Sequence, residues 1–120
     1  MNKEELKKDL ERARDALTEA LNVWCAAKED VYSAQSAAVA ATKLSDSFAA
    51  AYSEAIKDGS DLSNHHALSR EVYDSANRAG LAESFYYNAC ATASNAEDKI
   101  ATFGADLELA RDMYLKSEKT

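Results

Sequence analysis

A row of alanines spaced seven residues apart is the feature that most constrains how this chain can fold. The row runs without interruption through Ala13, Ala20, Ala27, Ala34 and Ala41. Phe48 interrupts it, and Ala55 resumes it. A companion row lies three residues earlier, at Leu10, Leu17, Trp24, Val31, Ala38, Ser45 and Tyr52. An apolar repeat of this period is the a/d seam of a coiled coil, here with mostly larger residues at a and alanine at d.

The second half of the chain repeats the scheme. Its a row is Val72, Ala79, Tyr86, Ala93, Ile100, Leu107 and Tyr114, and its d row is Ser75, Ala82, Ala89, Ala96, Phe103 and Ala110. Between the halves, Gly59 in "KDGSDLSN" suits the left-handed position just past a helix end. The chain contains no proline and three glycines, which favours uninterrupted helices. We predict one helical domain over 1–120, with helices over 3–57 and 64–117 and a turn over 58–63.

The turn sets a register that the two seams obey. In an antiparallel hairpin turning near residue 60, the numbers of facing residues share a sum near 120, as Leu17 with Phe103 and Ala34 with Tyr86 do. Large residues frequently face alanine in this register, which is how interdigitating layers fill space. The predicted fold class is all-α: a long antiparallel two-helix hairpin, an alanine-rich coiled coil.

Two serines are the weak point of this seam. Ser45 and Ser75 would face each other, where a mutual hydroxyl hydrogen bond would satisfy both. Alternatively, Ser45 caps a new helix. That alternative is a three-helix bundle with a break near residues 43–46.

A single seam leaves a hairpin without the second layer that domains normally have. Beside the seam, the g edges of the two helices lie on the same side and carry further apolar residues, whereas the opposite e edge reads as mostly polar. The candidate protein-contact surface on the g side, with two residues one step further out, is Val23, Leu44, Leu81, Phe85, Leu109 and Met113. Two hairpins meeting there would form a four-helix bundle, so we expect a homodimer.

Charge and cysteine content narrow the function classes. The formal net charge is −7, which disfavours direct binding to nucleic acid. No apolar run is long enough to span a membrane, and the N-terminus lacks the apolar core of a secretory signal. Cys25 and Cys90 lie far apart and outside any CxxC motif, so they are expected as free thiols in the cytoplasm.

Nothing in the sequence points to catalysis or to a cofactor. His65 and His66 are adjacent, so on a helix they face different ways, and we expect solvated histidines instead of a metal site. The chain has no Glu-x-x-His pair for a di-iron centre, no glycine-rich phosphate loop and no Gly-x-Ser-x-Gly. Tyr32, Tyr73 and Tyr87 lie off the seam, where tyrosines are common in recognition surfaces.

The tail carries one motif. "YLKSE", Tyr114 to Glu118, fits Tyr-x-x-x-Asp/Glu and resembles the export signal of the WXG family of small secreted helical hairpins, which pair as four-helix bundles. The Trp-x-Gly of that family's turn is absent: this turn reads "DGSD", and Trp24 lies inside the first helix. The resemblance implies an alternative role as a secreted hairpin or a secretion chaperone.

These observations together predict a non-enzymatic module that binds a partner protein. Size and acidity also suit a small phage or mobile-element inhibitor of a host protein complex, acting in the host cytoplasm. An acidic mimic of nucleic acid is the third candidate, because the chain is acidic overall.

Overall fold

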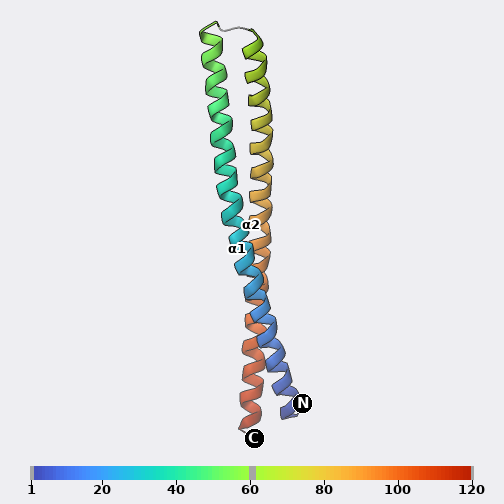
Figure 1. Cartoon of the computed structure of the whole chain (residues 1–120). Helices are drawn as coiled ribbons and strands as arrows, with labels where there is room; N and C mark the ends of the chain where they lie inside the picture. The colour runs from blue at the N-terminus through green and yellow to red at the C-terminus, as the bar shows by residue number, and fades with distance from the viewer. Residues whose placement is uncertain (1, 60–61, 120) are drawn as a thin grey trace. The chain divides into compact units, whose positions relative to one another are not determined.

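The computed structural model describes residues 2–59 and 62–119, and of residues 62–64 the backbone only. It contains two helices, α1 (Lys3–Lys57, 55 residues) and α2 (Leu62–Glu118, 57 residues), and no strand among the described residues. The predicted all-α helical hairpin is thus confirmed, with each helix bound within two residues of its expected position (Figure 1).

Local chemistry explains where α1 begins and ends. The Oδ1 atom of Asn2 accepts a hydrogen bond of 2.9 Å from the backbone N–H of Glu5, as an N-cap residue does. Glu4 and Glu5 lie in the first turn and Lys57 in the last, in favourable positions for the helix dipole. Gly59 then adopts a φ of 65°, the left-handed conformation that ends a helix.

The structure contradicts the three-helix alternative. α1 continues through residues 43–46 without a break, and the hydroxyl of Ser47 donates to the carbonyl oxygen of Lys43 one turn earlier. Ser75 is buried, as a seam position should be. However, its hydroxyl donates to the carbonyl oxygen of Val72, 3.1 Å away in its own helix, so the expected bond to Ser45 was wrong.

The chain divides into two compact units, each of which contains part of both helices. Unit 1 consists of Met1–Glu29 and Cys90–Thr120, and unit 2 of Asp30–Ala89. Both chain termini belong to unit 1 (Figure 1). The backbone hydrogen bonds of each helix run between neighbouring turns, so a helix can continue from one unit into the next. Both α1 and α2 do so, with residues in each unit.

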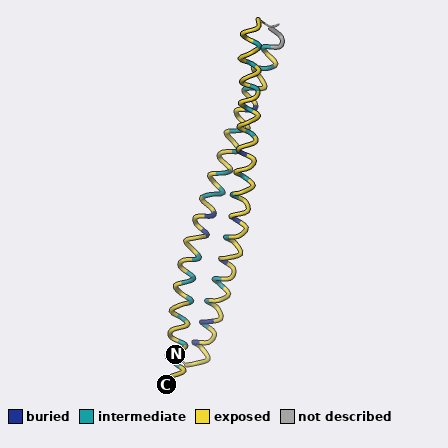
Figure 2. The backbone as a smooth tube through the Cα atoms, turned by 90° about the vertical axis from the view of Figure 1, so that its left-hand side faces the viewer, coloured by how far each residue is buried: buried dark blue, intermediate teal, exposed yellow. Residues whose placement is uncertain are grey.

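Burial within each unit follows the predicted seam. From Leu6 to Ala55 every a and d residue of α1 is buried or half-buried, and the same holds in α2 from His65 to Ser117. Buried apolar residues are few among those described, and most are small: Leu6, Leu10, Ala20, Ala27, Ala38, Ala93 and Ala96. Figure 2 shows how much of each helix stays exposed.

The antiparallel register can be checked from polar contacts between the helices. Trp24 Nε1 donates to Glu97 Oε1 at 3.2 Å, and Lys3 Nζ lies 3.5 Å from Glu118 Oε1, both within unit 1. In unit 2, His65 Nε2 lies 3.1 Å from the carbonyl oxygen of Ala55. The residue numbers in each pair add to 120 or 121, in agreement with the predicted register.

Candidate protein interaction surface

All six residues of the candidate contact surface are exposed. The exposed fraction ranges from 43% at Met113 to 67% at Phe85. These six residues fall into two sets: Val23, Leu109 and Met113 belong to unit 1, and Leu44, Leu81 and Phe85 belong to unit 2. Each set therefore has to be judged within its own unit.

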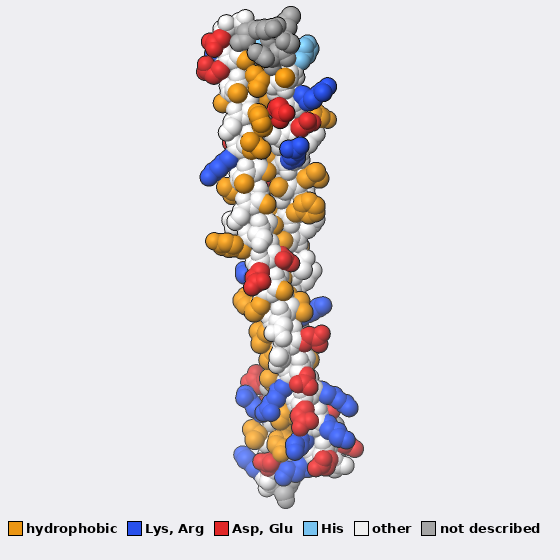
Figure 3. Space-filling view, in the orientation of Figure 1, with side chains coloured by type: hydrophobic (Ala, Val, Ile, Leu, Met, Phe, Trp, Pro, Cys, Tyr) orange, Lys and Arg blue, Asp and Glu red, His pale blue; other side chains and the backbone are white. Residues whose placement is uncertain are grey.

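The unit 1 set lies among charged side chains. Val23 borders a hollow of about 270 Å³ that Glu19 and Lys99 also line. Leu109 and Met113 border another of about 200 Å³ together with Asp9 and Asp106. Figure 3 shows acidic and basic side chains crowded at the end that carries the termini, which belongs to this unit. Covering these apolar residues would also desolvate the neighbouring charges, which is costly.

The unit 2 set has a different setting. We name it the aliphatic face: Leu44, Leu81 and Phe85, with the exposed alanines Ala37, Ala40 and Ala51 on the g and c positions beside them. Position c lies next to g on a helix, so these residues form one strip beside the seam. From Ser33 to Ala51 on α1 and from Arg78 to Asn88 on α2, the g and c positions hold one charged residue, Arg78.

Unit 2 also exposes apolar residues on the opposite side of its seam. We name this the tyrosine face: Tyr32, Val39, Tyr73 and Tyr87, with exposed fractions from 50% to 74%. Val39 and Tyr87, from different helices, border one hollow of about 350 Å³ together with Gln35, Thr42, Lys43 and Glu83. The e residues that line this hollow, Gln35, Thr42 and Glu83, are polar, and the exposed apolar residues of the tyrosine face lie one step further out.

Val39 is the residue that the sequence reasoning missed. It occupies the b position, one step outside the e edge, seven residues after Tyr32. Inspection of the e and g edges alone passes over the b row. Continuing the count outward would have added Val39 to the row of Tyr32 and placed both on the side of Tyr73 and Tyr87, which the sequence had already marked as off the seam.

The two histidines lie in different environments. His66 is exposed, as expected. His65 is half-buried in the seam: its ring meets that of Tyr52 edge-on at 6.5 Å, and its Nε2 reaches the Ala55 carbonyl in the last turns of α1. The expectation that both are solvated is wrong for His65, which satisfies a carbonyl that the end of α1 leaves without a partner of its own.

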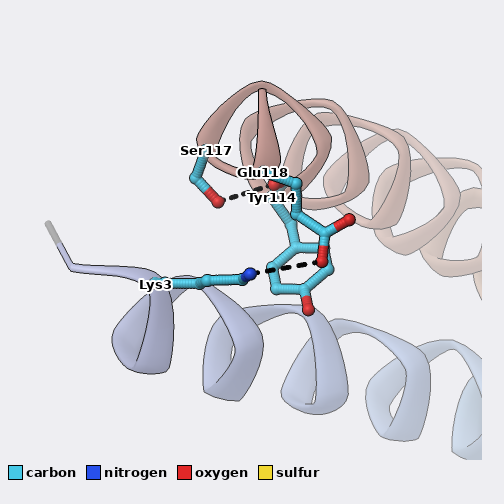
Figure 4. A network of polar contacts seen from close by, with 4 residues as sticks. All are labelled: Lys3, Tyr114, Ser117 and Glu118. Carbon is cyan, nitrogen blue, oxygen red and sulfur yellow. Dashed lines mark hydrogen bonds and ion pairs between the residues drawn. The ribbon is translucent and has the colours of Figure 1, made fainter. Parts of the chain in front are cut away.

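The tail motif lies in the last two turns of α2. Figure 4 shows that Glu118 and the Tyr114 ring lie beside Lys3 of α1, with the Lys3–Glu118 ion pair of 3.5 Å between them. Tyr114 is half-buried at a seam position, and the carbonyl oxygen of Tyr114 accepts a hydrogen bond of 2.6 Å from Ser117. Glu118 thus pairs with α1 within unit 1, whereas the hydrogen bond to the Tyr114 carbonyl lies within α2.

Metal binding, cysteine pairing and membrane crossing can each be assessed in the part of the chain that is described. No group of three or more His, Cys, Asp or Glu side chains there is arranged to hold a metal ion. Cys25 and Cys90 are free thiols. In the described helices, no segment has the length and apolar character needed to cross a membrane.

Comparison with known proteins finds no match to this chain among family models, curated proteins or solved structures.

Proposed function

We propose that this chain is a non-enzymatic protein–protein interaction module, and that it offers the aliphatic face of unit 2 to another helical surface. The observation that carries the proposal is that the buried apolar residues are mostly small, whereas many large apolar residues are exposed. Among the described residues, the buried apolar set consists of two leucines and five alanines, whereas the exposed large apolar residues number thirteen. Where such residues gather in one strip, as on the aliphatic face, exposed apolar surface marks interaction sites in soluble proteins.

We assign the contact to the aliphatic face, and not to the other exposed apolar residues, because covering it removes water from few charged side chains. Its apolar side chains neighbour alanines, serines, Asn88 and one charged residue, Arg78, whereas those of unit 1 neighbour Glu19, Lys99, Asp9 and Asp106. A partner helix laid along it would complete a bundle, the mode in which amphipathic helices recognise grooves. A cytoplasmic location is part of the proposal, and the free thiols of Cys25 and Cys90 support it.

Affinity capture from extracts of the cell in which the gene is expressed tests the proposal. The bait is the full chain, compared with Phe85→Glu on the aliphatic face and Tyr87→Glu on the tyrosine face. Both residues are 67% exposed and lie two positions apart on α2, so the two variants are matched. We expect capture of a bound protein that Phe85→Glu loses and Tyr87→Glu keeps. Equal capture by all three baits would contradict the proposal.

A further inference from the structure

We infer that the partner covering the aliphatic face is a second copy of this chain, with Leu81 and Phe85 of each copy packed over Ala37 and Ala40 of the other. This inference rests on the proposed function and names its partner. The resulting dimer has two-fold symmetry, so each contact occurs twice.

The face is self-complementary in size. Between Ser33 and Ala51 the g and c positions of α1 are mostly small: Ser33, Ala37, Ala40, Ser47 and Ala51, with Leu44 as the exception. The acidic Asp30 and Glu54 occupy the g and c positions on either side of this stretch. The facing positions of α2 carry the bulky Leu81 and Phe85, which are 62% and 67% exposed. Within the chain, the seam already pairs a large residue on one helix with alanine on the other, as at Ala34 and Tyr86. The same pairing between copies would fill space in the same way.

The levels of these residues along the hairpin also match. Under a register sum of 120 to 121, Phe85 lies level with residues 35 and 36, and Leu81 with residues 39 and 40. With the two-fold axis parallel to the helices, α2 of one copy lies on α1 of the other, at the same level. Phe85 then meets Ala37, and Leu81 meets Ala40, without any shift of register.

Charge favours this face for contact between two acidic copies. Unit 2 has eight acidic and four basic residues, so two copies repel each other unless the surfaces that meet are nearly neutral. Between Ser33 and Ala51 the g and c positions of α1 carry no charge, and the level stretch of α2, residues 69–88, carries Glu71, Asp74 and Arg78 at these positions, a net charge of −1. The hollow on the tyrosine face includes Glu83 and Lys43 in its lining, together with the polar Gln35 and Thr42.

Covering the small residues of the aliphatic face on α1 costs few hydrogen bonds and little conformational entropy. The Ser47 hydroxyl already donates to the Lys43 carbonyl at 2.9 Å, so covering it costs no hydrogen bond. Alanine side chains lose almost no conformational entropy on burial. The α1 side of the interface is therefore ready to receive Leu81 and Phe85.

Light scattering across a concentration series measures the association directly. We expect the wild-type chain to form a dimer and Phe85→Glu to raise the dimer dissociation constant by more than about 100-fold, because each dimer then loses two central aromatic contacts. Tyr87→Glu, the matched variant on the tyrosine face, should change the constant less than about 3-fold. Circular dichroism checks that both variants keep the helical content of the wild type.

A mixing experiment separates this geometry from non-specific association. Ala37→Lys and Phe85→Glu should each fail to dimerise alone, because each places a charge against an apolar residue at both contacts. Mixed in equal amounts, they should form a heterodimer. At one contact the introduced lysine of one variant then faces the introduced glutamate of the other, and at the second contact the native Phe85 and Ala37 meet. Native mass spectrometry distinguishes the three species by mass.

A wild-type chain that stays monomeric, or a mixture that forms no heterodimer, would overturn the inference. The proposed function would survive a monomeric wild type if affinity capture still depended on Phe85, since the aliphatic face would then bind a different protein. An equal increase in the dimer dissociation constant for Phe85→Glu and Tyr87→Glu would also reject the inferred dimer, because the contact between copies would then not be confined to the aliphatic face.

Discussion

Units 1 and 2 share one seam and the same two helices but differ in composition and burial. Of its 60 residues, unit 1 has 23 that are Asp, Glu, Lys or Arg and three that are aromatic, whereas unit 2 has 12 and seven. Among the residues whose burial is described, unit 1 contains six of the seven buried apolar ones and unit 2 contains Ala38. Of the thirteen exposed large apolar side chains in that set, eight belong to unit 2. The difference means that unit 1 buries more of its apolar seam, whereas unit 2 exposes the larger share of the apolar side chains.

The largest contrast is expected from matched leucine truncations. Leu10→Ala, at a residue 7% exposed in unit 1, should lower the free energy of unfolding by about 2–4 kcal/mol, because it leaves a cavity in the seam. Leu44→Ala, at a residue 47% exposed in unit 2, should cost less than about 1 kcal/mol. Urea unfolding measures both, in a Phe85→Glu background so that association does not contribute. Similar losses at the two sites would erase the distinction between the units.

Enlarging a seam alanine tests how tightly each unit is packed. Ala27→Leu, at a residue 5% exposed in unit 1, should destabilise by about 1–3 kcal/mol through overpacking. Ala34→Leu, opposite the Tyr86 layer in unit 2, should fall at the lower end of that range because Ala34 is only half-buried. The adjacent exposed Ala26→Leu is the control, with an expected effect within about 0.5 kcal/mol. Equal costs at Ala26 and Ala27 would reject the heptad assignment.

A smaller effect is expected where α1 ends in unit 2. His65→Phe keeps an aromatic ring beside Tyr52 but removes the hydrogen bond to the Ala55 carbonyl, and should cost about 0.5–1.5 kcal/mol. Hydrogen exchange should then quicken in the last turns of α1 while the unit 1 amides are unaffected. His66→Phe, on the exposed neighbour, is the control. Unchanged exchange in His65→Phe would mean that this bond does not hold the helix end.

The smallest effects are stabilising. A Cβ atom at Gly80 in unit 2 or at Gly104 in unit 1 would meet nothing within 4 Å. Gly80→Ala and Gly104→Ala should therefore each raise the free energy of unfolding by up to about 1 kcal/mol, through helix propensity alone. Thermal unfolding followed by circular dichroism measures the gain. A loss of stability at either position would show that the backbone there needs the glycine for a contact within the chain.

The sequence by itself determined the hairpin, its helix bounds and the residues of its seam. These follow from local chemistry and from a repeat that can be counted: Gly59 ends α1, Asn2 caps it, and the seven-residue rows assign each side chain to a face. The exposure of Leu81 and Phe85 was predictable for the same reason, since a residue beside a single seam has no further layer to cover it.

Tertiary structure decided what periodicity leaves open. Whether α1 continues past Ser45 depends on how well the turns before and after that residue pack against α2, and the helix does continue. Which acceptor Ser75 and His65 choose depends on the distances between particular atoms once the helices have met, and a heptad position does not specify them. The hollow beside Val39 and Tyr87 likewise arises only when two helices place their b and e residues side by side. A repeat assigns each residue to a face, whereas atomic contacts across the seam set the spacing and the polar partners of that face.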